Sequence, residues 1–181
     1  MKSLAAVFLF CLAIIPANAQ FANTSSANRP NPPSANAQIP PELLTGKTVF
    51  ISNAGGASGL FPEPFTGAPD RASTQFYAAM KSWGRYTLVD SPSSADLVFQ
   101  IELTAPVGAA KGSKQYGASD PLPEFHLVLF DRPAHYILWA LTESIDVAYR
   151  QKTHDRNFDD ALGTLVSDLK SLVLRPLPLT P

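Results

Sequence analysis

Apolar and polar residues alternate along residues 97–104, a pattern that is typical of a half-buried β-strand. One face of that strand is apolar, and the alternate residues are Val98, Gln100, Glu102 and Thr104. The apolar face consists of Leu97, Phe99, Ile101 and Leu103. Runs rich in β-branched and aromatic residues predict four further strands, at about 47–53, 86–89, 125–130 and 135–147.

Two other segments space their apolar residues as helices do. The first follows Pro69, which suits the first turn of a helix, and it ends at Gly84, which suits a C-terminal cap. The second is the closing apolar stripe, for which Asn157 is the predicted N-cap. Leu165 and Leu169 lie one turn apart on that stripe, so we expect both to be buried.

The predicted elements follow the order β-α-β-β-β-β-α. A helix between the first two strands implies a parallel pair, and the short links that follow favour antiparallel neighbours. We therefore predict an α+β fold, a mixed sheet with two helices on one face. The other face would show Gln100, Glu102 and Thr104 beside Val98, Val128 and Phe130, and it would be half solvated or in contact with a partner. In this arrangement the loops 54–68, 90–95 and 131–135 share one end of the sheet, and loop 106–123 and segment 149–157 share the other.

The first 19 residues have the parts of a secretory signal peptide. Lys2 gives the positive start, residues 4–15 are apolar or small, and residues 17–19 read Ala-Asn-Ala. We expect cleavage between Ala19 and Gln20 and a periplasmic or secreted protein. The apolar run is shorter than a spanning helix requires, so we predict no transmembrane span in the mature chain.

Composition divides the rest of the chain. Residues 20–46 combine five prolines with Asn, Ser and Ala and only two charged residues, so we predict a disordered linker there. Residues 47–174 form a single predicted domain, and residues 175–181 form an extended C-terminal tail.

Charge and cysteine content exclude several kinds of site. The net charge is −1 and only 16% of residues are charged, which lacks the basic surplus of a nucleic-acid binder. The only cysteine, Cys11, lies inside the predicted signal peptide, so the mature domain has no disulfide and no thiolate metal site. We predict no cofactor and no metal.

Candidate chemistry is sparse. The glycine run 54–59 follows a strand, but Pro62 and Pro64 prevent the helix that a dinucleotide site needs. An alternative hypothesis is a small hydrolase in which Ser58, Asp131 and His135 supply a nucleophile and its base. A histidine in water at the end of a hairpin is the simpler interpretation of His135.

The segment from Tyr86 to Leu103, followed later by Ile-Leu-Trp-Ala at 137–140 and an acidic amphipathic helix, resembles small α/β domains of bacterial envelope proteins. The amino-terminal domain of TolB and the curli-secretion lipoprotein family are examples. The resemblance covers about residues 47–174 as a pattern of elements. It implies an envelope setting and protein contacts, and it transfers no catalytic residues. The lipid-modified cysteine of those lipoproteins has no counterpart in this chain.

These observations favour an exported bacterial envelope domain that binds an envelope protein or another envelope component without catalysis. Two alternatives stay open, the hydrolase with Ser58, Asp131 and His135, and a small-ligand binder that uses the open face of the sheet.

Overall fold

The structure is a computed structural model that describes residues 38–56, 58–106 and 122–174. All of these residues belong to one unit of the chain, Gln38–Pro181. The predicted signal peptide, the linker up to residue 37, the C-terminal tail and most of loop 106–123 lie outside the described residues and stay predictions.

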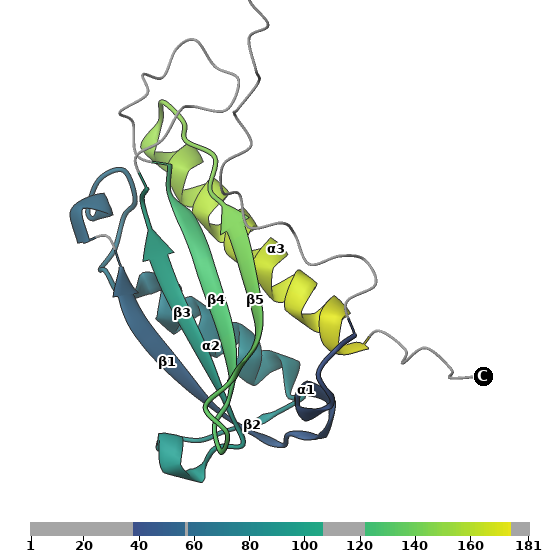
Figure 1. Cartoon of the computed structure of the whole chain (residues 1–181). Helices are drawn as coiled ribbons and strands as arrows, with labels where there is room; N and C mark the ends of the chain where they lie inside the picture. Colours follow the sequence, from purple (N-terminus) through teal and green to yellow (C-terminus); the bar gives the residue numbers. More distant parts are fainter. Residues whose placement is uncertain (1–37, 57, 107–121, 175–181) are drawn as a thin grey trace, which may run out of the picture. The chain divides into compact units, whose positions relative to one another are not determined.

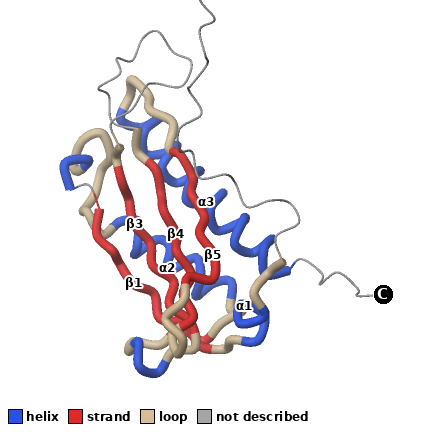
Figure 2. Tube along the Cα trace, in the orientation of Figure 1, coloured by secondary structure: helices blue, strands red, loops and turns tan. Residues whose placement is uncertain are grey.

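The described residues form one mixed sheet with helices packed on one of its faces (Figures 1 and 2). The strands are β1 (Thr48–Gly56), β2 (Thr87–Leu88), β3 (Leu97–Thr104), β4 (Glu124–Asp131) and β5 (Ile137–Ser144). The α-helices are α1 (Pro41–Thr45), α2 (Arg71–Trp83) and α3 (Gln151–Leu174).

The strand order is β2-β1-β3-β4-β5. β1 is parallel to β2 and to β3, whereas β3, β4 and β5 form an antiparallel meander. The predicted α+β class, the mixed sheet and the placement of both long helices on one face are confirmed.

The core lies between the sheet and the helices α2 and α3. In β3 the residues alternate between buried and half-buried along the whole strand, as the sequence pattern predicts. β4 turns Phe125, Leu127 and Leu129 toward the same side. α3 contributes Leu165 and Leu169, whose exposed fractions of 1% and 0% confirm the predicted stripe.

The two helix starts differ in how well the sequence marks them. α2 begins shortly after Pro69 and ends at Gly84, whose φ of 67° is the predicted left-handed cap. The prediction for α3 is wrong, because this helix begins at Gln151 rather than after Asn157. Its first turns are polar and carry no apolar stripe. Asn157 lies inside the helix, where its amide donates a hydrogen bond of 2.9 Å to the carbonyl of Asp146.

The direction of β3 also differs from the prediction. β2 has only two residues and ends beside Val49, so the chain crosses the start of β1 and begins β3 at Leu97, also beside Val49. β3 therefore runs parallel to its predecessors. This corrects the predicted distribution of loops, because segment 149–157 lies at the same end as the loop after β1, and turns 90–95 and 131–135 lie at the opposite end.

Residues 38–46 belong to the folded unit, which corrects the predicted end of the linker. Leu43 of α1 is fully buried and Ile39 is 5% exposed. The hydroxyl of Tyr86 donates a hydrogen bond of 2.7 Å to the carbonyl of Leu43. The average composition of residues 20–46 is polar and rich in proline, so it does not reveal that these two apolar side chains are buried.

Candidate functional site

Ser58 lies at the carboxyl end of β1, where it begins the short 3-10 helix η1 (Ser58–Leu60). Asp131 ends β4 and pairs with Leu97, the first residue of β3. Because β3 runs parallel to β1, most of the length of β3 separates the two residues, roughly 20 Å at about 3.3 Å per residue. A nucleophile and its base must lie about 3 Å apart. The structure does not bring Ser58 together with its proposed partners.

Asp131 and His135 share the turn between β4 and β5, and there they shape the backbone. The Asp131 carboxylate accepts a hydrogen bond of 2.8 Å from the main-chain N–H of Ala134. His135 is exposed, and its φ of 59° is in the left-handed region. A short carboxylate that binds a nearby N–H is a common stabiliser of tight turns. This pair therefore has a structural role in the hairpin.

The face of the sheet opposite α2 and α3 is the candidate functional surface (Figure 2). Its side chains stand in rows, because residues in register on neighbouring strands point to the same side. The row nearest the start of β1 is apolar, and we call it the apolar row. It consists of Phe50, Val98, Phe130 and Ile137. Ile137 is 64% exposed and the other three are half-buried.

The same face becomes polar toward the other end of the strands. Glu102 stands opposite His126 in the register of β3 and β4, and Thr142 of β5 stands on the other side of His126. The imidazole Nε2 of His126 lies 2.7 Å from a carboxylate oxygen of Glu124. Within the described residues, no group of acidic and histidine side chains is arranged to hold a metal ion.

The sequence predicts the members of this surface on β3 and β4 but not the order of its side chains. It predicts that Gln100, Glu102 and Thr104 share the open face with Val98, Val128 and Phe130, and the structure confirms this. Phe50 and Ile137 were missed as members of the apolar row. Only the pairing of β1 with β3 and of β4 with β5 places them beside Val98 and Phe130.

A cluster of charges holds the loop after β1 against α3. The guanidinium of Arg71 lies 2.6 Å from Asp155 and 2.7 Å from Asp159, and it stacks over the ring of Phe158 at 4.3 Å. Asp155 also accepts the N–H and the hydroxyl hydrogen bonds of Thr66, each at 2.9 Å.

The Asp155 carboxyl is shifted by these contacts. Burial acts to raise its pKa, but the hydrogen bonds from Thr66, Arg71 and Gln151 outweigh burial and lower the pKa to about 2. His154, the preceding residue, packs its ring edge-on against Phe65 at 6.0 Å. The sequence predicts His154 at the other end of the sheet from this loop, and the parallel direction of β3 corrects that prediction. The contacts of this cluster are those of a structural clamp.

A shallow depression of about 380 Å³ lies at the opposite end of the sheet, lined in part by Glu42, Lys47, Asp96 and Asp131. The carboxylate of Asp96 accepts hydrogen bonds of 2.8 and 3.0 Å from the main-chain N–H groups of Lys47 and Thr48. These bonds lower the pKa of Asp96. Asp96 therefore ties the start of β1 to the start of β3.

No protein-family model matches the sequence, and no curated protein matches it. Solved structures with a similar course of the chain include a DUF4136 family protein from Bacteroides thetaiotaomicron, with 13% identity, 76% of this chain and 94% of that chain covered, and a TM-score of 0.48. A DUF330 protein from Xanthomonas campestris has 13% identity, coverage of 71% and 84%, and a TM-score of 0.44. An uncharacterised lipoprotein B from Nitrosomonas europaea has 12% identity, coverage of 76% and 85%, and a TM-score of 0.40.

Likenesses at this level assign neither an activity nor a partner to this chain. The resemblance to the TolB amino-terminal domain and to the curli-secretion lipoproteins stays a prediction. Within residues 38–56, 58–106 and 122–174, no helix combines the length and the apolar character that crossing a membrane requires.

Proposed function

We propose that this chain is an exported bacterial envelope protein whose open sheet face binds another protein without catalysing a reaction. The observation that carries the proposal is the apolar row. Its four side chains keep part of their surface accessible on a face that neither α2 nor α3 covers. Apolar residues bordered by polar ones are typical of a protein-binding surface.

The side chains of the open face change from apolar to polar along the strands. This change favours a protein partner whose surface changes from apolar to polar in the same direction. Phe130 and Ile137 supply apolar contact area at one end, and Glu102, Glu124 and His126 supply hydrogen-bonding groups at the other. Apolar contacts would contribute most of the binding energy, and the polar groups would fix the orientation.

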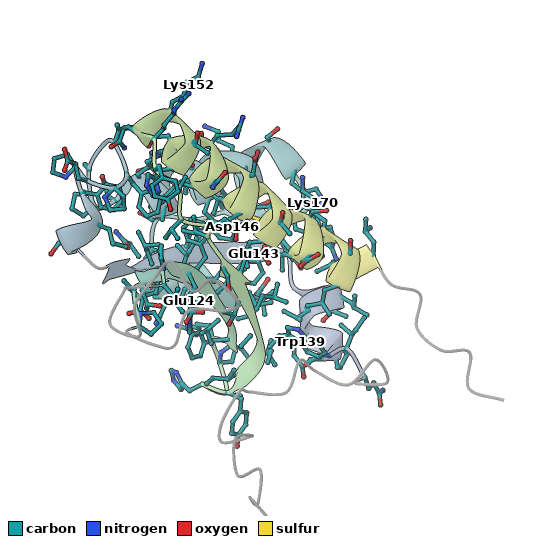
Figure 3. All side chains as sticks on the ribbon, turned by 90° about the horizontal axis from the view of Figure 1, so that it is seen from above. Glu124, Trp139, Glu143, Asp146, Lys152 and Lys170 are labelled. Carbon is teal, nitrogen blue, oxygen red and sulfur yellow. The ribbon has the colours of Figure 1, made fainter. Side chains whose placement is uncertain are left out.

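Site-specific photocrosslinking tests this proposal in the cells that produce the protein. A photoreactive phenylalanine analogue replaces Phe130 on the open face or, as the matched control, Lys152 on α3, which projects away from the sheet (Figure 3). We expect a distinct crosslinked protein at position 130 and none at position 152. Equal crosslinking at both positions, or none at either, would contradict the proposed binding face.

A second variant checks the energetic role of the row. Phe130→Ser removes an aromatic ring that is half-buried at the surface. We expect the protein that crosslinks at position 130 of the parent chain not to be recovered when the Phe130→Ser chain is purified from the same cells. The melting curve of the variant must show a folded chain for this loss to count. Unchanged recovery in a folded Phe130→Ser protein would place the contact elsewhere.

Export is the other part of the proposal, and it rests on the sequence pattern of residues 1–19. N-terminal sequencing of the protein from an envelope fraction should give Gln20 as the first residue. A chain that retains residues before Ala17 would contradict cleavage at the predicted site.

A further inference from the structure

The two edges of the sheet differ in their protection against an additional strand. At the β5 edge, Glu143 points toward the helix-covered face, in register with buried Phe125. It lies near Asp146 (Figure 3), and the carboxylate of Asp168 is also close enough to act on it. An inward-pointing charge is one of the devices that discourage edge-to-edge pairing. The other edge consists largely of β1, and residues 48–56 contain neither a charged residue nor a proline.

The hydrogen bonds at the start of β1 show which of its later backbone groups point away from β3. The carbonyl of Thr48 accepts a hydrogen bond from the β3 side, whereas the carbonyl of Val49 accepts one from the residue that follows β2. Backbone groups along a parallel strand alternate between its two neighbours, so the N–H and C=O groups of Ile51 and Asn53 point to the same side as those of Val49. β2 ends beside Val49, and among the described strands none pairs with this outer side of Ile51 and Asn53.

A groove of about 290 Å³ lies along this edge, between β1 and α2. Its lining is uncharged and consists of Ile51, Asn53, Ser73, Thr74 and Tyr77. The Ser73 hydroxyl donates to the carbonyl of Asp70, and the Asn53 side-chain oxygen accepts the N–H of Gly55. These polar side-chain atoms are already used within the protein. The backbone edge and the 39% exposed ring of Tyr77 are left for recognition.

We propose that this edge binds an extended, uncharged peptide segment of another protein, which adds a strand beside Ile51 and Asn53. The main-chain hydrogen bonds would be independent of the sequence of the segment. Alternate side chains of the segment would contact Ile51 and Tyr77 in the groove and favour apolar residues there. The site uses the backbone edge of β1 and the groove beside α2, whereas Phe50 of the apolar row points to the open face. The proposal therefore does not depend on the function proposed for that row.

The dimensions of the edge favour a peptide over a second copy of the chain. The free stretch from Phe50 to Asn53 spans about 13 Å at 3.3 Å per residue. The register shift between Asn53 and Gly56, with a φ of 94° at Gly55, ends the regular edge. A stable interface between two folded proteins needs about 800 Å² per partner. A four-residue ladder supplies much less, and the uncharged lining gives no anchor for a charged segment.

The test uses a phage-displayed library of random eight-residue peptides as the probe and the full chain as the target. Asn53→Pro removes an N–H that points away from β3, which is a position where an edge strand tolerates proline. Asn53→Ala is the matched control, because it removes the side chain and keeps the N–H. We expect enriched peptides to be uncharged, with apolar residues at alternate positions. They should bind Asn53→Pro at least tenfold more weakly and Asn53→Ala as well as the parent chain.

Amide hydrogen exchange gives an independent readout in the unmodified chain. The amides of Ile51 and Asn53 should exchange rapidly without peptide and become protected when an enriched peptide is added. The amide of Ser52, which points toward β3, should be protected in both conditions. This measurement decides the question if Asn53→Pro does not fold.

Several results would overturn the proposal. These are a library that yields no enriched peptide, equal binding to the parent and to Asn53→Pro, loss of binding in Asn53→Ala, and exchange at Ile51 and Asn53 that peptide does not change. A concentration-dependent dimer that Asn53→Pro dissociates would assign the edge to a second copy instead.

Discussion

The two faces of the sheet are built from the same strands, but they follow different rules. On the helix-covered face the side chains of β3 and β4 are almost fully excluded from water, and among the described residues no polar or charged residue is buried. On the open face the alternate residues of those strands keep part of their surface and change from apolar to polar along the sheet. The need to bury apolar area determines the side chains of the covered face, whereas the same need does not determine those of the open face.

The largest expected effect comes from neighbouring residues of β4 that point to opposite faces. Leu127 is fully buried beneath the helices, and Val128 is half-buried on the open face. Leu127→Ala should lower the free energy of unfolding by about 2–5 kcal/mol, because it removes buried methyl groups and leaves a cavity. Val128→Ala should cost less than about 1 kcal/mol, the range of intrinsic strand preferences. Chemical denaturation of both variants measures the difference.

Equal losses for the two variants would show that the two faces of the sheet do not differ in burial. They would mean that Val128 is covered as completely as Leu127 in solution, and that the open face is occupied by part of the chain itself. A loss for Leu127→Ala that is at least twice the loss for Val128→Ala supports an open face that is available to a partner.

The next effect concerns the clamp at the border of the covered face. Asp155→Asn keeps the size of the side chain but weakens its contacts with Arg71 and Thr66. Hydrogen bonds to charged groups contribute more than neutral ones, so we expect a loss of roughly 1–3 kcal/mol in the free energy of unfolding at neutral pH. Arg71→Met should give a loss of the same order, since it removes the same pairing from the other side.

The pH dependence separates a charge effect from a packing effect. The pKa of Asp155 is about 2 in the folded chain, below its ordinary value of 3.8. Its contribution is therefore present above about pH 4 and is lost as the pH falls toward 2. The difference between the parent chain and Asp155→Asn should shrink in this window. A difference that is constant from pH 6 to pH 2.5 would show that the carboxylate charge has no part in the clamp.

The sequence predicts local structure here better than it predicts which strands and loops lie next to one another in the fold. The alternation at 97–104 fixes which face of β3 is buried, and Gly84 marks the end of α2, because both signals depend on a few adjacent residues. The direction of β3 depends on β2 being only two residues long, and no local pattern contains that length. The same error separated His154 from Phe65 and placed Ser58 with Asp131. The apolar row needs the register of four strands, which the sequence of any one strand does not contain.

A smaller effect tests the one acidic side chain of β5 that points toward the covered face. Burial raises the pKa of Glu143, and the nearby carboxylates of Asp168 and Asp146 raise it further. Its charged form is therefore unfavourable in the folded chain. Glu143→Gln should stabilise the protein at pH 7 by up to about 1 kcal/mol. The gain should vanish below the ordinary value of 4.5, where the parent is already protonated. A destabilised Glu143→Gln protein at pH 7 would show that the charge has a favourable partner.

The smallest effect is expected for the contact between His126 and Glu124 on the open face. His126 contacts Glu124 at 2.7 Å, but the histidine side chain is 39% exposed and the glutamate 24%, so water screens the pair. His126→Ala should change the free energy of unfolding by no more than about 0.5 kcal/mol. His126→Gln, which retains a hydrogen-bonding group, is the matched control, and thermal melting at pH 7 measures both.

The same variant tests binding at the polar end of the face, because this end contributes so little to folding. If the protein that crosslinks at position 130 no longer binds the folded His126→Ala variant, the polar end takes part in binding. If His126→Ala instead lowers stability by several kcal/mol, the polar end is part of the folding core, and the contrast between the two faces does not hold there.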